Sequence, residues 1–223
     1  MPDSRNALSP SNSSIRAAQS TRVTFPVLSW LALAWLAVWI PAYWRVWGWR
    51  NFLHFCDIAV ILSCAGIILG SRLLISSQAL ATLVAGIVWF LDAGWRVMFH
   101  HDLIGGTEYL WDASKPLWVR LLSLFHIALP ILLVVLCARM GYDRRALALQ
   151  SGITAGLMAI SRWIGQASNL NYTYADPILH RAVGPAPLHL AIIFAGTVLL
   201  FYLPAHLLLA WKFSGRKNSS PVL

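Results

Sequence analysis

Long apolar runs alternate with short polar stretches along almost the whole chain. Six runs stand out, over residues 25–43, 51–70, 74–96, 117–138, 146–165 and 186–211. A helix needs about 20 mostly apolar residues to cross a hydrocarbon core ~30 Å thick, and each run approaches that length. The pattern therefore predicts an all-α polytopic membrane protein with six transmembrane helices.

Turn-forming residues mark where these helices are expected to end. Pro41 is expected to close the first helix, because proline is poorly tolerated inside a helix. Gly70 and Arg72 separate the second helix from the third. The segment ARMGYDRR, residues 138–145, is expected to form a tight polar hairpin between the fourth and fifth helices.

The two ends of the chain differ from the rest in being polar. Residues 1–24 and 213–223 are expected to be disordered cytoplasmic tails, which leaves one transmembrane domain over residues 25–212. No internal repeat is visible, so an inverted-repeat transporter is not indicated.

The composition of the chain is typical of a membrane protein rather than of a soluble one. Apolar residues make up 58% of it and charged residues only 11%, against roughly 25% charged residues in soluble domains. The net charge of +9 does not indicate nucleic acid, because the basic residues flank apolar runs instead of lining one soluble face. Membrane lipids are the expected partners.

The three cysteines, Cys56, Cys64 and Cys137, all lie inside apolar runs and show no CxxC spacing. Neither a disulfide framework nor a zinc site is therefore expected. No cofactor is expected either. Cys64 and Cys137 are expected to be packing residues, since buried thiols are common in cores.

The distribution of basic residues predicts the topology. Ten lysines and arginines fall on the side of the chain termini and seven on the other side. Because basic residues favour the cytoplasm, both termini are predicted to be cytoplasmic. The loops near 97–116 and 166–185 are predicted to face outward from a bacterial cytoplasmic (inner) membrane, which the chain crosses several times.

Polar side chains from several predicted helices gather in the outer half of this bundle. Ionisable groups are costly in hydrocarbon and usually face the bundle interior. Asp57 is expected to need a partner, which Arg96 or Arg162 is placed to supply. The predicted supporting cluster comprises Asp57, Asp92, Arg96, Arg162, Asn169, Asn171 and Tyr172.

Cys56 and His126 are the candidate catalytic residues. At ~100° per residue, His54 points away from Cys56 on the same helix, so a base for the thiol must come from another helix. His126 is the histidine placed well inside a run at a matching depth. Pro130 frees the carbonyl of His126 from its helical partner and predicts a kink there. A thiol beside an imidazole is a nucleophile with its base.

Three short segments carry a resemblance to a known family. LHFCDIA in the second run, FHIALP in the fourth and SNLNYTYADP before the sixth resemble motifs of YwaF-like bacterial integral membrane proteins. That group is distantly related to eukaryotic six-helix enzymes that act on acyl lipids with a Cys/His or Thr/His pair. The resemblance implies Cys56 as nucleophile, His126 as base, and Asn171 with Tyr172 in the polar rim.

Two functions stay open from the sequence. One is a lipid-directed acyl hydrolase or acyltransferase with an intramembrane Cys56/His126 pair near the outer leaflet. The other is a non-enzymatic membrane protein, a small-molecule carrier or an assembly partner, whose polar cluster holds the helices together. A haem or metal protein using His54, His126 and His189 is disfavoured, because no HxxxH or HExxH spacing is present.

Overall fold

The computed structural model describes residues 25–213, and within them the fold is all-α, as the sequence predicts. The helices are α2 (Pro26–Trp47), α3 (Phe55–Ile68), α4 (Arg72–Phe99), α5 (Leu117–Leu122), α6 (Phe125–Met140), α7 (Ala146–Ile164), α8 (Ala186–Gly196) and α9 (Leu203–Phe213). The 3-10 helices are η1 (Trp49–Leu53), η2 (Glu108–Trp111), η3 (Gln166–Ser168) and η4 (Leu170–Tyr172). A π-helical segment, η5 (Thr197–Tyr202), joins α8 to α9. Apart from Phe213, the predicted tails lie outside the described residues.

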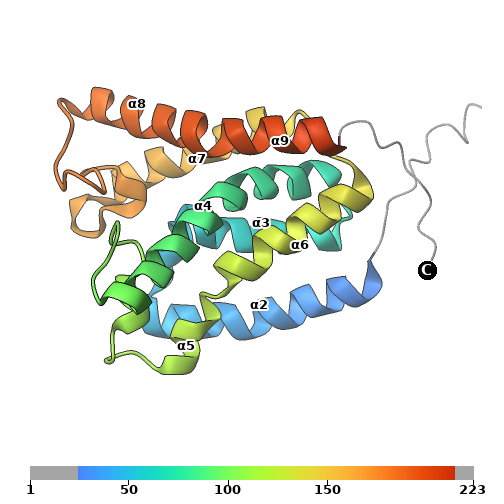
Figure 1. The fold of residues 1–223 in the computed structure, drawn as a ribbon, viewed down its shortest axis with the longest axis horizontal. Coiled ribbons are helices and arrows are strands. Elements are labelled where there is room, and N and C mark those ends of the chain that lie inside the picture. The colour runs from blue at the N-terminus through green and yellow to red at the C-terminus, as the bar shows by residue number, and fades with distance from the viewer. Residues whose placement is uncertain (1–24, 214–223) are drawn as a thin grey trace, which may run out of the picture.

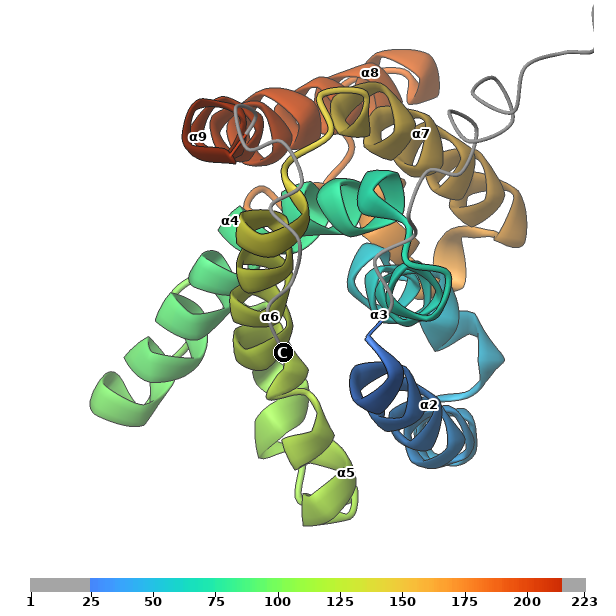
Figure 2. The same ribbon diagram turned by 90° about the vertical axis from the view of Figure 1, so that its right-hand side faces the viewer.

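The helices run side by side along one axis (Figure 1). One end of the bundle carries two long connections, the first loop (100–116) and the second loop (165–185), and is here called the loop end. Both ends of the described chain lie at the opposite, terminal end (Figure 1). Seen from the terminal end, α4 crosses the middle of the bundle (Figure 2), where it packs against α3, α6, α7 and α9.

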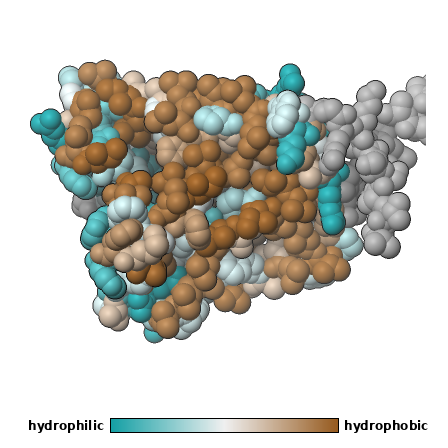
Figure 3. Space-filling view, viewed as in Figure 1, coloured by the Kyte–Doolittle hydropathy of each residue, from teal (hydrophilic) through white to brown (hydrophobic). Residues whose placement is uncertain are grey.

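Four helical stretches are long and apolar enough to cross a membrane. They are Pro26–Trp47, Arg72–Phe99, Leu117–Met140 and Ala186–Phe213. The face in Figure 3 shows the corresponding surface, an apolar band with hydrophilic residues gathered toward its two ends. The chain is therefore a multi-pass helical membrane protein by helix length and hydropathy.

The two remaining helices are less typical spans, so the count of six stays a prediction. The α3 helix has 14 residues, about 21 Å at ~1.5 Å per residue, because the chain before it forms η1 instead. The α7 helix has 19 residues but is less apolar, since it carries Gln150, Ser161 and Arg162.

Pro41 does not close the first helix, and that expectation is wrong. The α2 helix continues through it to Trp47, because a proline removes only one backbone donor and membrane helices tolerate this loss. The helix ends at Gly48, whose φ of 80° suits glycine. The Gly48 N–H donates to the carbonyl of Trp44 over 3.0 Å.

The fourth span is interrupted between Leu122 and Phe125. The α5 helix ends at Leu122 and α6 begins at Phe125, and Pro130 lies inside α6. The carbonyl of His126 that Pro130 frees lies against α4 at Gly86, where a Cβ atom would be 2.5 Å from the oxygen. The missing side chain at Gly86 therefore lets α4 and α6 approach closely.

The terminal half of the bundle has a polar network of its own between α4, α7 and η5. Gln78 Nε2 donates to Ser77 Oγ over 2.8 Å and to Gln150 Oε1 over 3.2 Å. The hydroxyls of Thr154 and Tyr202 lie 2.7 Å apart. These bonds join three helical segments inside the bundle, where amide and hydroxyl groups need partners.

Candidate functional site

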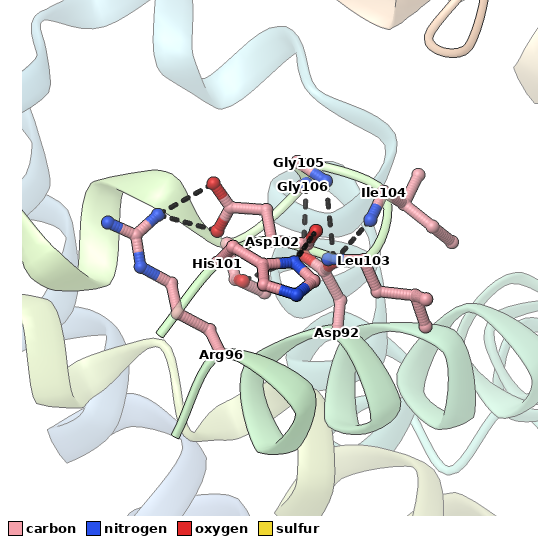
Figure 4. Close-up of polar contacts among 9 residues, drawn as sticks. Asp92, Arg96, His101, Asp102, Leu103, Ile104, Gly105 and Gly106 are labelled. Carbon is pink, nitrogen blue, oxygen red and sulfur yellow. Dashed lines mark hydrogen bonds and ion pairs between the residues drawn. The ribbon is translucent and has the colours of Figure 1, made fainter. Parts of the chain in front are cut away.

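The Asp92 side chain accepts hydrogen bonds from the first loop and so fixes its conformation. This side chain, on a residue only 1% exposed, points from α4 into the loop (Figure 4). Oδ1 accepts the N–H groups of Leu103, Ile104 and Gly105 at 3.1, 2.7 and 3.3 Å. Oδ2 accepts the N–H of Gly106 at 3.0 Å and the hydroxyl of Thr107 at 2.7 Å. With five donors, this carboxylate is satisfied without a cation.

Arg96, one turn further along α4, fixes the start of the same loop. Its Nη1 donates to both carboxylate oxygens of Asp102, at 2.5 and 2.7 Å (Figure 4). The guanidinium also lies over the ring of Trp111, 5.6 Å from its centroid. Arg96 therefore bonds to the first loop and not to Asp57.

Asn169 and Asn171 organise the second loop, and both have positive φ, which asparagine tolerates. Asn169 Oδ1 accepts the N–H groups of Tyr174 and Ala175 at 3.0 and 2.9 Å. Asn171 reaches across the bundle to the start of α3. Its Oδ1 accepts the Phe55 N–H at 3.0 Å, so it caps α3 from a segment 116 residues away.

Arg162 at the end of α7 also belongs to the second loop. Its Nη1 donates to the Thr173 carbonyl over 3.0 Å, and its guanidinium lies 3.8 Å from the centroid of the Tyr174 ring. Tyr174 completes the contact by donating its hydroxyl to the Arg162 carbonyl over 2.6 Å. These bonds hold the loop against α7.

His189 is a structural residue that the sequence analysis did not select. It is buried in α8, where Nδ1 accepts the Val183 N–H at 3.1 Å. Nε2 therefore carries the proton and donates to the Tyr172 carbonyl over 2.9 Å. Both ring nitrogens are used, so His189 has no lone pair for a metal. A histidine in an otherwise apolar helix was the available signal.

A cavity of about 420 Å³ lies between the two loops. Its lining residues are Asp102, Leu103, Ile104, Gly105, Glu108, Asn169, Tyr172, Asp176, Pro177 and His180. Three of these carry carboxylates and none is lysine or arginine. Burial raises the pKa of Tyr172, and Cys56, Asp92 and Glu108 raise it further. The lining of the cavity therefore contains more acidic than basic side chains.

Cys56 and Asp57 lie at the start of α3. Cys56 is half-buried, and its thiol donates to Asp57 Oδ1 over 3.9 Å. Asp57 is 2% exposed and accepts a bond from the Asn51 amide at Oδ2. The expected arginine partner of Asp57 is wrong, because Arg96 and Arg162 are held by loop groups.

His126 is sandwiched between aromatic rings. Its ring stacks on Trp89 with centroids 4.9 Å apart and on Phe125 with centroids 4.1 Å apart. Nδ1 lies 2.8 Å from the Ser123 carbonyl, which only accepts, so Nδ1 carries the proton. The lone pair therefore sits on Nε2, for which no hydrogen bond is found in residues 25–213.

Cys56 and His126 bond to different partners, Asp57 and Ser123. Within residues 25–213 no hydrogen bond joins the Cys56 thiol to the His126 imidazole. The Ser123 carbonyl holds His126, and the Ser123 hydroxyl donates to the Arg120 carbonyl. Tyr43 and Tyr109 lie within electrostatic range of Cys56. Sequence reasoning missed Ser123, Tyr43 and Tyr109, because no spacing singles them out.

The chemistry available at this site is limited by its charges. A thiolate at Cys56 would lie beside the Asp57 carboxyl without a cation to stabilise it. In residues 25–213 the salt bridges are Arg96–Asp102 and Arg145–Asp143, and neither brings a cation to Cys56. The described residues also contain no group of three histidine, cysteine or acidic side chains that would hold a metal ion.

Comparison with models of protein families, with curated proteins and with solved structures gives no match for this chain. The resemblance to YwaF-like membrane proteins therefore stays a prediction, and the site has to be interpreted from its own geometry.

Proposed function

We propose that the protein is a non-enzymatic membrane carrier that takes up a small, positively charged molecule in the cavity between its two loops. The observation that carries this proposal is the cavity of about 420 Å³ at the loop end. The bacterial cytoplasmic membrane and an outward-facing loop end, both expected from the sequence, are part of the proposal.

The way the loops are held supports a binding role. Asp92 and His189 are buried beneath the loops and bond to loop backbone rather than to each other. Such bonds fix the loops before any ligand arrives, and a preorganised site loses less entropy on binding. Stability of the bundle alone would not require two long connections to be fixed around an open space.

The charge of the lining indicates the class of ligand. Asp102 is neutralised by Arg96, but Glu108 takes part in no salt bridge within residues 25–213. Asp176 uses Oδ1 to accept the N–H groups of Ile178 and Leu179, each at 2.8 Å, and it takes part in no salt bridge within residues 25–213. An ammonium group with hydrogens to donate fits such a lining.

Binding of a fluorescent primary amine, dansylcadaverine, to the purified protein in nanodiscs tests the proposal by fluorescence anisotropy. We expect the amine to bind at least several-fold more tightly than its N-acetylated, neutral analogue. Glu108→Gln should weaken binding by about fivefold, the size of effect expected from one partly exposed charge. Asp112→Asn, which changes an acid outside the cavity lining, is the matched control.

Two results would count against a cation site. One is equal affinity for the amine and for its acetylated analogue. The other is a loss of affinity in Asp112→Asn as large as that in Glu108→Gln, which would indicate general attraction to the surface rather than binding in the cavity.

A second function, acyl transfer or hydrolysis on membrane lipids, is favoured by one observation at His126. Its tautomer leaves the Nε2 lone pair available, as a general base requires. A thiol-reactive lipid probe should then label the wild type and fail to label both Cys56→Ala and His126→Ala. Labelling that persists in His126→Ala would remove the histidine from the reaction, and labelling that persists in both variants would exclude the pair.

A further inference from the structure

Two buried aspartates in this bundle have opposite surroundings. Asp92 and Asp57 are 1% and 2% exposed. Asp92 accepts five hydrogen bonds from the first loop (Figure 4). Asp57 has the Asn51 amide at Oδ2 and, at Oδ1, a thiol whose sulfur is 3.9 Å away. The first arrangement suits a carboxylate, whereas the second provides few donors for one.

The elements around Asp57 supply no positive charge. On α4, which packs along α3, Arg96 binds Asp102. On α2 and η1, Arg45 and Arg50 are exposed, and the guanidinium of Arg50 lies over the Trp49 ring. His54 makes no hydrogen bond to the Asp57 side chain within residues 25–213.

The other titratable groups near this carboxyl are neutral or acidic. Tyr43 from α2 and Cys56 from α3 lie within electrostatic range of it. Tyr109 from η2 and Tyr172 from η4 lie within range of Cys56. From α6, His126 donates a hydrogen bond from Nδ1–H to the Ser123 carbonyl.

An ionised carboxylate that is buried without a cation and with few donors is strongly unfavourable, and such a group takes up a proton instead. We propose that Asp57 is a proton-binding carboxyl, uncharged in this enclosed arrangement and able to release its proton when the pH is raised. In that step the O–H bond of the carboxyl breaks and a water molecule takes the proton.

Asp57 is not among the residues that line the cavity between the loops. Protonation of Asp57 itself does not depend on any ligand, so it goes beyond the proposed function and is tested separately.

Infrared difference spectroscopy of the full chain in lipid membranes tests the proposal. A protonated carboxyl has a C=O stretching band that a carboxylate lacks, and the chain has only 8 aspartates and glutamates. We expect this band at neutral pH, its loss in Asp57→Asn, and its loss in the wild type as the pH is raised. Asp92→Asn is the matched control and should keep the band, because Asp92 is held as a carboxylate.

A carboxylate accompanied by a small cation is the alternative. It would give no band at neutral pH, and replacing sodium by choline in the buffer would change the carboxylate bands. Either result overturns the proposal, as does a band that persists in Asp57→Asn. The wild-type spectrum alone separates these cases if Asp57→Asn does not fold. Absence of dansylcadaverine binding would overturn the proposed function and leave this result unchanged.

Discussion

A single side chain, that of Asn171, connects three parts of the loop end. Its Nδ2 donates to the Leu53 carbonyl at 2.8 Å and to Ser161 Oγ at 3.0 Å, while Oδ1 accepts the Phe55 N–H. The second loop, α7 and the start of α3 are thus held together by three hydrogen bonds from one amide. Since Asn171 is buried, its removal would leave several of these groups without partners.

Replacing Asn171 by alanine should therefore lower the free energy of unfolding by about 2–4 kcal/mol, the cost of unsatisfied buried groups together with strain at φ 54°. Asn171→Gly relieves the strain but not the lost bonds, so we expect it to be destabilised by about 1 kcal/mol less. Thermal unfolding in detergent, followed by tryptophan fluorescence, measures both. Equal stability of the wild type and the alanine variant would contradict the bridging role.

At the residue scale, the sequence predicted which polar residues gather but not what they bind. Asp92, Asn169 and Asn171 do lie at one end of the bundle, since helix direction and depth place them there. Their partners are mostly backbone groups of loops, and loop backbone follows no hydrophobic period. For this reason Asp57 was expected to pair with an arginine, whereas Arg96 and Arg162 bind the loops.

At the scale of elements, the contact between α4 and α6 depends on a residue without a side chain. A Cβ atom at Gly86 would lie 2.5 Å from the His126 carbonyl oxygen and 2.8 Å from Pro130 Cγ. The oxygen is backbone and has little freedom to move. Pro130 and Gly86 therefore work together: one frees the carbonyl, and the other makes room for it.

Gly86→Ala should consequently destabilise the protein by about 1–3 kcal/mol, as overpacking of a close contact does. Gly94→Ala in the same helix is the control, because nothing lies within 4 Å of the added Cβ atom. Alanine favours helix over glycine, so Gly94→Ala should be neutral or up to about 1 kcal/mol more stable. Equal unfolding temperatures for the two variants would show that the close approach is absent.

The hairpin between α6 and α7 makes a pH-dependent contribution to the stability of the folded protein. Hydrogen bonds and the charge of Arg145 hold the pKa of Asp143 below its usual value of 3.8. Arg145 Nε and Nη2 donate to this carboxylate at 3.1 and 2.8 Å. The pKa of Asp143 is lower in the folded state than in the unfolded state. The stabilisation from this ion pair is therefore complete above pH 3.8 and is lost as the pH falls through the pKa of the folded state.

We therefore expect the unfolding temperature of the wild type to exceed that of Asp143→Asn at neutral pH and to approach it below pH 3.8. Arg145→Gln should behave like Asp143→Asn, since it removes the other half of the same pair. A constant difference between wild type and Asp143→Asn across this range would mean that the ion pair is not its origin.

At the scale of the whole molecule, the lengths of the apolar runs predicted the helices better than the proline positions did. The all-α fold and the order of the helices follow from those runs. The break before Phe125 and the π-helical η5 do not, because each depends on how neighbouring helices pack. The short α3 begins late because η1 and the Asn171 cap use the residues before it, and such a tertiary cap has no local signature.

The topology can be tested with two single-cysteine variants. The loop end and the terminal end are opposite ends of the bundle (Figure 1), so Asp112 and Arg144 should lie on opposite sides of the membrane. In a background carrying Cys56→Ser, with Cys64 and Cys137 buried, we expect Asp112→Cys to react with a membrane-impermeant maleimide in intact cells. Arg144→Cys should react only after permeabilisation, because the excess of basic residues keeps its side in the cytoplasm. The reverse pattern would invert the topology and place the cavity inside the cell. Reaction of both variants in intact cells would contradict an odd number of crossings between Asp112 and Arg144, and with it a bundle that spans the membrane.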